Sequence, residues 1–293
     1  MINENSTMKV FIEKAEVLIE ALPYIQKFYG KTVVIKYGGS ALINPEIKET
    51  LIKDIALMKL VGMKPVIVHG GGPDINAFLK KMDIKSEFIN GLRVTDPETM
   101  QIVEMVLAGK LNKSIVTDIE LQGVKSVGIS GKDGGILKAE KIEKDGIDYG
   151  CVGDVKEVDT SLIESLINND FIPVIAPIGK DETGTTYNIN ADYAAVAIAG
   201  ALKAEKLVFL TDVEGVMRDV HDPDSIMSFI RADKVQALID DGTISGGMIP
   251  KVQCCMAGVE AGVENVHILD GRVEHCLLLE IFTQKGIGTM ISK

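Results

Sequence analysis

Short apolar runs alternate with helix-like segments along most of this chain, and the alternation limits the possible folds more than any other feature. A run of four or five apolar residues is typical of a buried strand, whereas apolar residues spaced three and four apart indicate a helix. We expect strands at residues 32–35, 65–68, 172–175, 207–210 and 265–269, and helices at 45–60, 97–121, 190–204, 232–239 and 249–262, with a short helix from Pro73 and an end segment from Val273. Strands joined through helices need crossover connections, so the sequence predicts an α/β protein with a mainly parallel sheet.

Two segments depart from this alternation. An amphipathic helix at residues 7–22 precedes the first strand and is expected to end at Pro23 or at residues 29–30. Between residues 126 and 158, turn signals such as the Gly-rich stretch 131–135 separate three short runs. These turns predict an antiparallel patch within the otherwise parallel protein.

Charge and composition exclude several classes of function. The 31 Lys and Arg residues against 42 Asp and Glu give a net charge of −11, which would repel nucleic acid, and no basic stripe offsets it. Cysteines at positions 151, 254, 255 and 276 lack CxxC spacing, so neither a zinc site nor a disulfide framework is expected. No apolar run approaches the roughly 20 residues that span a bilayer, and charged residues interrupt the first 22 positions, where a signal peptide would be apolar. We therefore expect a cytoplasmic protein without a nucleic-acid or membrane partner.

Two of the expected strands run directly into glycines. Lys36 lies near the carboxyl end of the first strand and is followed by Gly38 and Gly39, and the second strand leads into residues 70–73, Gly-Gly-Gly-Pro. Glycine backbone N–H groups can approach an anion closely and lysine adds a positive charge, so these loops suit a phosphoryl group. The carboxyl ends of neighbouring parallel strands also form the ligand crevice of open α/β sheets. Ordinary strand exits beside a solvated lysine are the alternative.

Other nucleotide and catalytic signatures are missing. Residues 30–32 resemble the end of a P-loop, but position 25, where a P-loop needs glycine, is Ile, and no GxGxxG opens a helix after a strand. The histidines stand without partners at metal-ligand or triad spacing, at His69, His221, His267 and His275. A transferase without a general base suits a carboxylate acceptor, because that group is already ionised at pH 7.

Six motifs together carry a family resemblance over nearly the whole chain. They are VVIKYGGSAL at 33–42, VIVHGGGP at 66–73, NGLRVTD at 90–96, NINAD at 188–192, LTDVEGV at 210–216 and GGMIPKV at 246–252. The chain resembles the N-acetylglutamate kinases of the amino-acid kinase family. The Lys-Gly-Gly strand exit and the late lysine are shared with carbamate, aspartate, glutamate and UMP kinases, whereas NGLRVTD with NINAD narrows the acceptor to N-acetylglutamate.

The resemblance implies a three-layer αβα sandwich with an acceptor-binding lobe at residues 29–180 and a nucleotide-binding lobe at 181–293, divided near the polar stretch 179–187. It implies transfer of the γ-phosphoryl group of ATP to the side-chain carboxylate of N-acetyl-L-glutamate, the second step of arginine biosynthesis. Mg²⁺ would be held mainly by the nucleotide phosphates and not by a protein metal site. Two alternatives stay open: a related kinase that uses carbamate or aspartate, and an arginine-sensing protein that has lost catalysis.

The resemblance also implies roles for single residues. Lys36 and Lys251 would contact the nucleotide and stabilise the transferring phosphoryl group, with Asp192 between them orienting both. The remaining contacts would be Gly38 and Gly39 on the ATP phosphates, Asp212 on the nucleotide, Gly71 and Gly72 on the acceptor carboxylate and phosphoryl group, Arg93 on the acceptor α-carboxylate, and Asn188 on the substrate. A bidentate guanidinium suits a carboxylate. Surface positions for the lysines and for Arg93, and a helix cap for Asn188, are the alternatives.

The two ends of the chain point to regulation. The helix within residues 1–28 and the segment 267–291 resemble the arginine-sensitive, hexameric branch, in which interlaced N-terminal helices join three dimers into a ring. Arginine would bind beside the helix junction, with Glu280 and Gly286 at that site. A PII-type signalling protein is a further expected partner. The alternative is that the apolar stripe of the helix packs on its own subunit.

Overall fold

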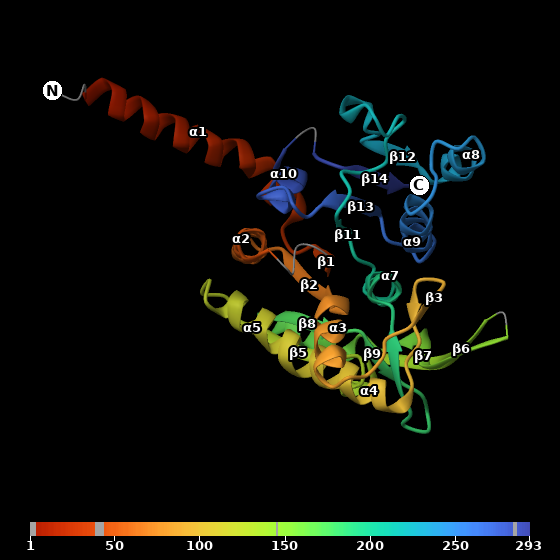
Figure 1. The fold of residues 1–293 in the computed structure, drawn as a ribbon. Helices are drawn as coiled ribbons and strands as arrows, with labels where there is room; N and C mark the ends of the chain where they lie inside the picture. The colour runs from red at the N-terminus through yellow and green to blue at the C-terminus, as the bar shows by residue number, and fades with distance from the viewer. Residues whose placement is uncertain (1–3, 39–43, 145, 284–285) are drawn as a thin grey trace.

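The computed structural model describes residues 4–38, 44–144, 146–283 and 286–293 (Figure 1). Its α-helices are α1 Glu4–Phe28, α2 Pro45–Leu60, α3 Gly72–Lys81, α4 Pro97–Glu104, α5 Asn112–Glu120, α6 Ser161–Asn168, α7 Ala191–Ala201, α8 Val235–Asp240, α9 Met248–Glu260 and α10 Cys276–Phe282, with a π-helix, η2, at Met105–Leu111. Its strands are β1 Thr32–Tyr37, β2 Lys64–His69, β3 Phe88–Ile89, β4 Leu92–Arg93, β5 Ser126–Ser130, β6 Leu137–Lys144, β7 Ile147–Val158, β8 Ile172–Ala176, β9 Ile178–Lys180, β10 Thr186–Ile189, β11 Lys206–Thr211, β12 Phe229–Arg231, β13 Asn265–Asp270 and β14 Thr289–Ser292. Across these ranges, every helix is too short or too polar to cross a lipid bilayer.

The central sheet has eight strands in the order β12-β14-β13-β11-β1-β2-β8-β5. All neighbouring pairs are parallel except β13 and β14. The predicted mainly parallel sheet is therefore confirmed. The strands β1 and β2 lie side by side near its centre, with Tyr37 opposite His69 at their carboxyl ends.

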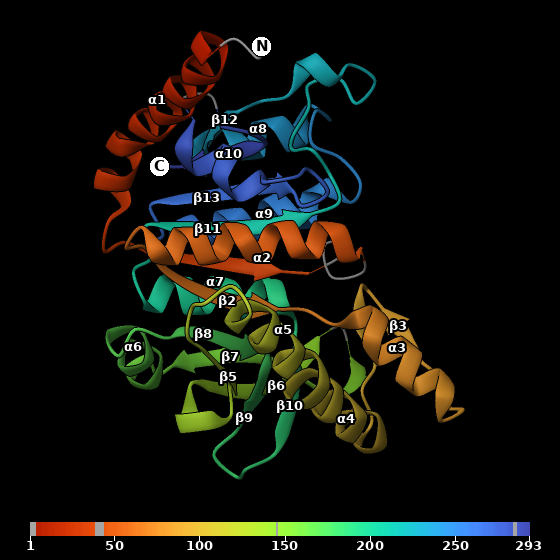
Figure 2. The same cartoon turned by 90° about the vertical axis from the view of Figure 1, so that its left-hand side faces the viewer.

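Helices cover both faces of this sheet. One face carries α2, α5 and α10, and the other carries α7 and α9 (Figures 1 and 2). Side chains of β1 alternate between the two faces, because successive residues of a strand point in opposite directions. Val33, Ile35 and Tyr37 belong to the core under α2 and α5, whereas Val34 belongs to the core under α7 and α9. Burial on both faces explains why the parallel strands are continuous apolar runs in the sequence.

A small closed barrel of β6, β7, β9 and β10 lies beside the main sheet (Figure 2). The antiparallel pairing of β6 with β7 confirms two of the three runs of the expected antiparallel patch. The first run, β5, pairs parallel with β8 at the edge of the main sheet, so it was wrongly assigned to the patch. The sequence did not predict that β9 and β10 close this patch into a barrel. The predicted lobe boundary at residue 180 falls between β9 and β10, and the division into two lobes stays a prediction.

Of the two ends expected for the first helix, the later one is confirmed. The helix continues through Pro23 to Phe28, and Tyr29-Gly30 follows its end. It projects beyond the body of the molecule in Figure 1. The helix expected at residues 97–121 is interrupted by a π-helical stretch, so it consists of α4, η2 and α5.

Candidate functional site

The two glycine loops lie at the same edge of the sheet. Because β1 and β2 are parallel, their carboxyl ends meet, and the Gly70 N–H donates a hydrogen bond of 2.8 Å to the Tyr37 carbonyl. Gly70 to Gly72 then connect β2 with α3, whose first residue is Gly72. This arrangement matches the ligand crevice expected of an open α/β sheet.

An ion pair joins the end of β1 to the start of α7. The Lys36 Nζ lies 2.9 Å from Asp192 Oδ1, and the lysine side chain is 16% exposed. Asn190 caps α7 by accepting a hydrogen bond from the Asp192 N–H, which fixes the first turn of the helix at this edge. A Cβ atom at Gly38 would lie 3.1 Å from the Lys36 Nζ, so glycine there leaves room for the lysine to turn toward Asp192. Gly39 lies outside the described residues.

A second lysine–aspartate pair joins α9 to the residue that follows β11. Lys251 is in the first turn of α9 and its Nζ lies 3.6 Å from Oδ1 of Asp212, which follows β11. The structure thus brings Asp192 to Lys36 but not to Lys251. Burial and the Asp192 charge raise the pKa of the Cys254 thiol to about 12, while Lys36 and Lys251 oppose that shift. Cys254 therefore lies within electrostatic reach of both lysines.

One member of each lysine–aspartate pair lines a hollow of about 1060 Å³. Asp192, Lys251 and Cys254 line one side of it, and residues of the β3–β4 turn and of the barrel line the other. The Asn90 side chain in that turn donates a hydrogen bond of 3.2 Å to the hydroxyl oxygen of Tyr149 in β7, which ties the turn to the barrel. A nucleotide with a small acceptor fits the size of such a hollow.

A smaller pocket of about 170 Å³ adjoins this hollow and contains the predicted acceptor residues. Its lining includes Gly71, Gly72, Arg93 and Asn188. A Cβ atom at Gly71 would overlap side chains of η2, so a larger residue would push the loop away from the helix. Among the described residues, the Gly71 N–H donates to no protein acceptor, so it is available to an anion.

Arg93 is almost fully buried without an acidic partner within ion-pair distance in the described part of the chain. Its Nη1 donates to the Ser86 hydroxyl, and its Nη2 donates to the Gly72 carbonyl at 3.3 Å. The guanidinium also lies over the Phe88 ring, 4.5 Å from its centroid. Burial lowers the pKa of Arg93 below its usual range. A buried cation held only by neutral groups is ready to receive a carboxylate.

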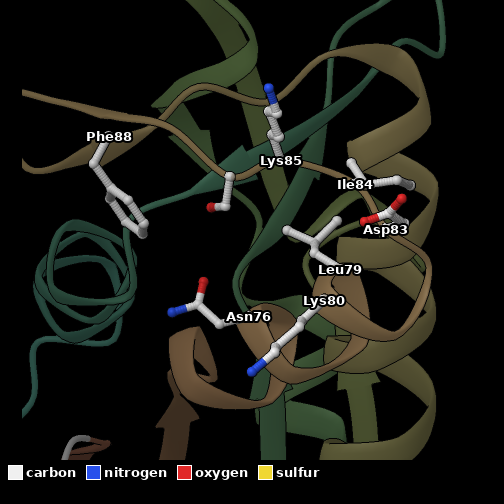
Figure 3. A pocket seen from close by; sticks show the side chains of 8 residues that line it. Asn76, Leu79, Lys80, Asp83, Ile84, Lys85 and Phe88 are labelled. Atoms are coloured by element: carbon white, nitrogen blue, oxygen red, sulfur yellow. The ribbon is translucent and has the colours of Figure 1, made fainter.

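A third pocket of about 350 Å³ lies between α3 and the segment that leads from it to Phe88 in β3 (Figure 3). Phe88 and Leu79 come from opposite sides of it in the figure. Its lining residues are Asn76, Leu79, Lys80, Asp83, Ile84, Lys85, Ser86 and Phe88. This pocket is separate from the lysine pairs, and it meets the acceptor pocket only at Phe88.

Asn188 belongs to β10, and its amide donates a hydrogen bond of 3.2 Å to the Thr95 hydroxyl. It is not a helix cap, because Asn190 performs that role for α7. Sequence reasoning did not single out Asn190, Cys254 or Tyr149 as site residues. An Asn before a helical pattern was an available signal for Asn190. No local pattern marks Tyr149, because the barrel brings it to the site.

Glu280 and Gly286 lie together at a second cluster, away from the lysine pairs. The Glu280 carboxylate is 3.0 Å from the His267 Nδ1 and 3.8 Å from the Lys206 Nζ, and it accepts a hydrogen bond from the Ile287 N–H. A Cβ atom at Gly286 would lie 2.6 Å from Glu280 Oε2. Burial raises the pKa of Glu280, but the hydrogen bond and charge of His267 outweigh it, so the pKa is lowered.

This chain is similar in sequence to a known family and to named relatives. The model of the amino acid kinase family matches residues 31–270. The acetylglutamate kinase of Heliobacterium modesticaldum is 57% identical over 96% of this chain and 99% of its own, and that of Methanocaldococcus jannaschii is 54% identical over 96% and 97%.

Solved structures of N-acetylglutamate synthase from Neisseria gonorrhoeae are also similar. The complex with coenzyme A and N-acetyl-glutamate has a TM-score of 0.83 at 28% identity, covering 95% of this chain and 63% of that chain. The complex with coenzyme A and L-arginine has a TM-score of 0.79 at 27% identity, covering 95% and 65%. The chain therefore belongs to the amino acid kinase family and, within it, to the acetylglutamate kinases.

Proposed function

We propose that this protein transfers the γ-phosphoryl group of ATP to the side-chain carboxylate of N-acetyl-L-glutamate, giving N-acetyl-L-glutamyl 5-phosphate and ADP, the second step of arginine biosynthesis. One observation carries the proposal: an acceptor pocket holding the buried Arg93, which has no acidic partner among the described residues, adjoins a large hollow lined by one member of each lysine–aspartate pair, Asp192 and Lys251. Relatives with 54–57% identity over nearly the whole chain support the same activity.

We assign roles to the site residues according to where negative charge develops during phosphoryl transfer. A carboxylate oxygen of the acceptor forms the new bond to the γ-phosphorus while the β–γ bridging oxygen leaves with ADP, and no general base is required. Lys36 from β1 and Lys251 from α9 would stabilise the negative charge on the transferring group. Asp192 holds Lys36 in place, and Gly71 and Gly72 would donate backbone N–H groups to the oxygens. Arg93 and Asn188 would hold the remainder of the acceptor.

The nucleotide would lie in the half of the molecule after residue 180, with Asp212 on its nucleoside side and Gly38 and Gly39 at its phosphates. The donor set fits a polyphosphate, because it combines two ammonium groups with a glycine N–H that has no acceptor in the described part of the chain. Mg²⁺ would enter on the nucleotide phosphates and neutralise part of their charge. The acceptor and nucleotide lobes, 29–180 and 181–293, belong to this proposal, as does a cytoplasmic location.

The decisive experiment measures ADP release with N-acetyl-L-glutamate, carbamate or aspartate as the acceptor. We expect activity only with N-acetyl-L-glutamate. Activity with carbamate or aspartate instead would favour the related-kinase alternative. No ADP release with any acceptor, from protein that is folded by circular dichroism, would favour an inactive arginine sensor.

We also propose that arginine inhibits the enzyme at the cluster of Glu280 and Gly286, and that the protein forms dimers that assemble into a hexamer through α1. The Lys206 Nζ lies 5.3 Å from the Phe28 ring centroid, so the end of α1 reaches this cluster. The arginine complex of the synthase from N. gonorrhoeae supports arginine as a ligand of this fold. A PII-type signalling protein that relieves inhibition completes the proposal.

A further inference from the structure

A buried polar network lies directly behind the glycine loop. His69 ends β2 and Asn112 begins α5, and both side chains are fully buried. The Asn112 Nδ2 contacts the His69 Nε2 at 3.2 Å, the Val174 carbonyl at 2.9 Å and the Ile129 carbonyl at 3.3 Å. The His69 Nδ1 lies 2.8 Å from the Gly70 carbonyl. None of these side chains lines the acceptor pocket.

The partners of Asn112 fix the proton on the imidazole. Carbonyl oxygens only accept hydrogen bonds, so the Asn112 nitrogen that faces Val174 and Ile129 is a donor. The His69 Nε2 must then accept, and the single proton of the neutral ring lies on Nδ1, from which it donates to Gly70. Burial lowers the pKa of His69 to about 4, so the ring stays neutral near pH 7.

The hydrogen bond from His69 to the Gly70 carbonyl also sets the direction of the Gly71 N–H. The Gly70 carbonyl and the Gly71 N–H belong to one trans peptide plane, in which the two groups point in opposite directions. When the carbonyl points at the imidazole, the Gly71 N–H points away from it. Gly71 lines the acceptor pocket and its N–H has no acceptor in the described part of the protein. Glycines on both sides of this peptide offer little resistance to a flip, which would aim the carbonyl at the anion.

We propose that His69, held by Asn112, is a positioning residue that keeps the Gly70–Gly71 peptide in the orientation that presents the Gly71 N–H to the transferring phosphoryl group and the acceptor carboxylate. The inference rests on the proposed phosphoryl transfer. A preorganised donor contributes most where charge develops in the transition state, so its loss lowers kcat more than it raises KM.

Matched substitutions separate this role from simple packing. An asparagine amide can occupy the place of Nδ1 and donate to Gly70, whereas a glutamine amide reaches one atom farther and replaces Nε2. We expect His69→Asn to keep kcat within about threefold of wild type, and His69→Gln and His69→Phe to lose at least about tenfold, with smaller changes in the N-acetylglutamate KM. Packing alone predicts the opposite order, because Gln and Phe fill the site better than Asn.

The assays use the full chain, with kcat expressed per folded protein from near-UV circular dichroism and unfolding midpoints. The exposed His221 provides the control, since His221→Asn and His221→Gln should both leave kcat unchanged. A His69→Phe enzyme with wild-type kcat, or a His69→Gln enzyme at least as active as His69→Asn, would overturn the proposal. Absence of N-acetylglutamate-dependent ADP release from wild-type protein would instead refute the proposed function.

Asn112→Leu keeps the test decisive if the His69 variants do not fold. Leucine neither donates nor accepts a hydrogen bond, so the His69 Nε2 loses the partner that holds the ring in place. The imidazole can then turn away from the Gly70 carbonyl, and kcat should fall at least about tenfold. An Asn112→Leu enzyme with unchanged kcat would contradict the role of the network.

Discussion

Lys36 and Lys251 reach the same region from different elements, and both side chains are only partly exposed. We predict that Lys36→Ala and Lys251→Ala each lower kcat by about 10²-fold or more, because their charges are needed most in the transition state. Steady-state ADP release measures this. Lys31→Ala is the matched control, since Lys31 is half exposed and pairs with Glu205 at 3.0 Å. Wild-type kcat in either variant would remove that lysine from the site.

Arg93 should act on binding and not on chemistry. Its proposed partner, the acceptor α-carboxylate, carries the same charge in the ground and transition states, so Arg93→Ala should raise the N-acetylglutamate KM and leave the ATP KM nearly unchanged. Losing a desolvated, charge-assisted pair costs roughly 2–5 kcal/mol, which corresponds to about 30-fold or more in KM. Initial-rate kinetics with each substrate varied provide the measurement. An unchanged acceptor KM would refute the assignment.

The buried His69 should make the free energy of unfolding depend on pH. Its pKa is lowered from 6.5 to about 4 by burial, so between these values the unfolded chain binds a proton that the folded protein does not. The free energy of unfolding should therefore fall as the pH decreases from about 6.5 to 4, by about 3 kcal/mol from this residue.

Denaturant unfolding at pH 7 and pH 4.5 tests this pH dependence. The loss on acidification should be smaller in His69→Asn, which cannot titrate, and unaltered in His221→Asn. An equal loss in wild type and His69→Asn would contradict the burial effect.

At the scale of elements, the packing of β5 against α5 holds Asn112 in place. A Cβ atom at Gly128 would overlap the Asn112 amide oxygen, whereas a Cβ atom at Gly109 in η2 would meet nothing within 4 Å. We predict that Gly128→Ala lowers the free energy of unfolding by about 1–3 kcal/mol, whereas Gly109→Ala leaves it unchanged or raises it by up to about 1 kcal/mol. Chemical denaturation measures both. Equal effects of the two substitutions would show that the β5–α5 contact tolerates a methyl group.

Local sequence patterns predicted the elements that are stabilised mainly by the burial of their own residues. The continuous apolar runs identified the parallel strands of the central sheet. The closed barrel was not predictable in this way, because β9 and β10 are short and pair with β6 and β7, about 40 residues earlier in the sequence. The π-helix was missed because its composition is that of an ordinary amphipathic helix.

In the candidate site, too, local sequence patterns predicted some residues, whereas tertiary packing determines the others. Lys36 and the glycines were recognisable because each lies at, or just after, the carboxyl end of a strand. The contact of Lys251 with Asp212 depends on how α9 packs against α7 and β13, and the burial of Arg93 depends on the hairpin reaching Gly72 at the start of α3. Tertiary packing decides these contacts, so no local sequence pattern could specify them.

At the scale of the whole molecule, the two clusters lie at opposite ends of the same strands. Lys206 begins β11 beside Val33, while Lys36 is near the end of β1. The His275 Nδ1 lies 2.7 Å from Asp54 Oδ1, which joins α10 to α2. Side chains of α2 and of β1 belong to the same core cluster, so the structure links α10, which carries Glu280, to the helix that covers β1.

The helix α1 exposes apolar side chains along most of its length. Its described side chains from Met8 to Glu20 are exposed and include Phe11, Leu18 and Ile19, whereas Phe28 is buried in the core. A truncation should therefore remove residues 1–20 and not the whole helix. We expect the truncated protein to keep its fold and its kcat without arginine, because the removed side chains contact little of their own subunit.

Light scattering should show dimers in place of hexamers, and inhibition by arginine should disappear, because an effector acts only through two states that it binds differently. Glu280→Gln provides the companion variant, since it removes the charge of the proposed arginine site without touching α1 and should weaken inhibition while leaving the hexamer intact. Inhibition of the truncated dimer at the wild-type arginine concentration would contradict the coupling. A wild-type protein that is dimeric and indifferent to arginine would refute the regulatory proposal, because α1 would then have neither a neighbouring subunit to bind nor an effector site to complete.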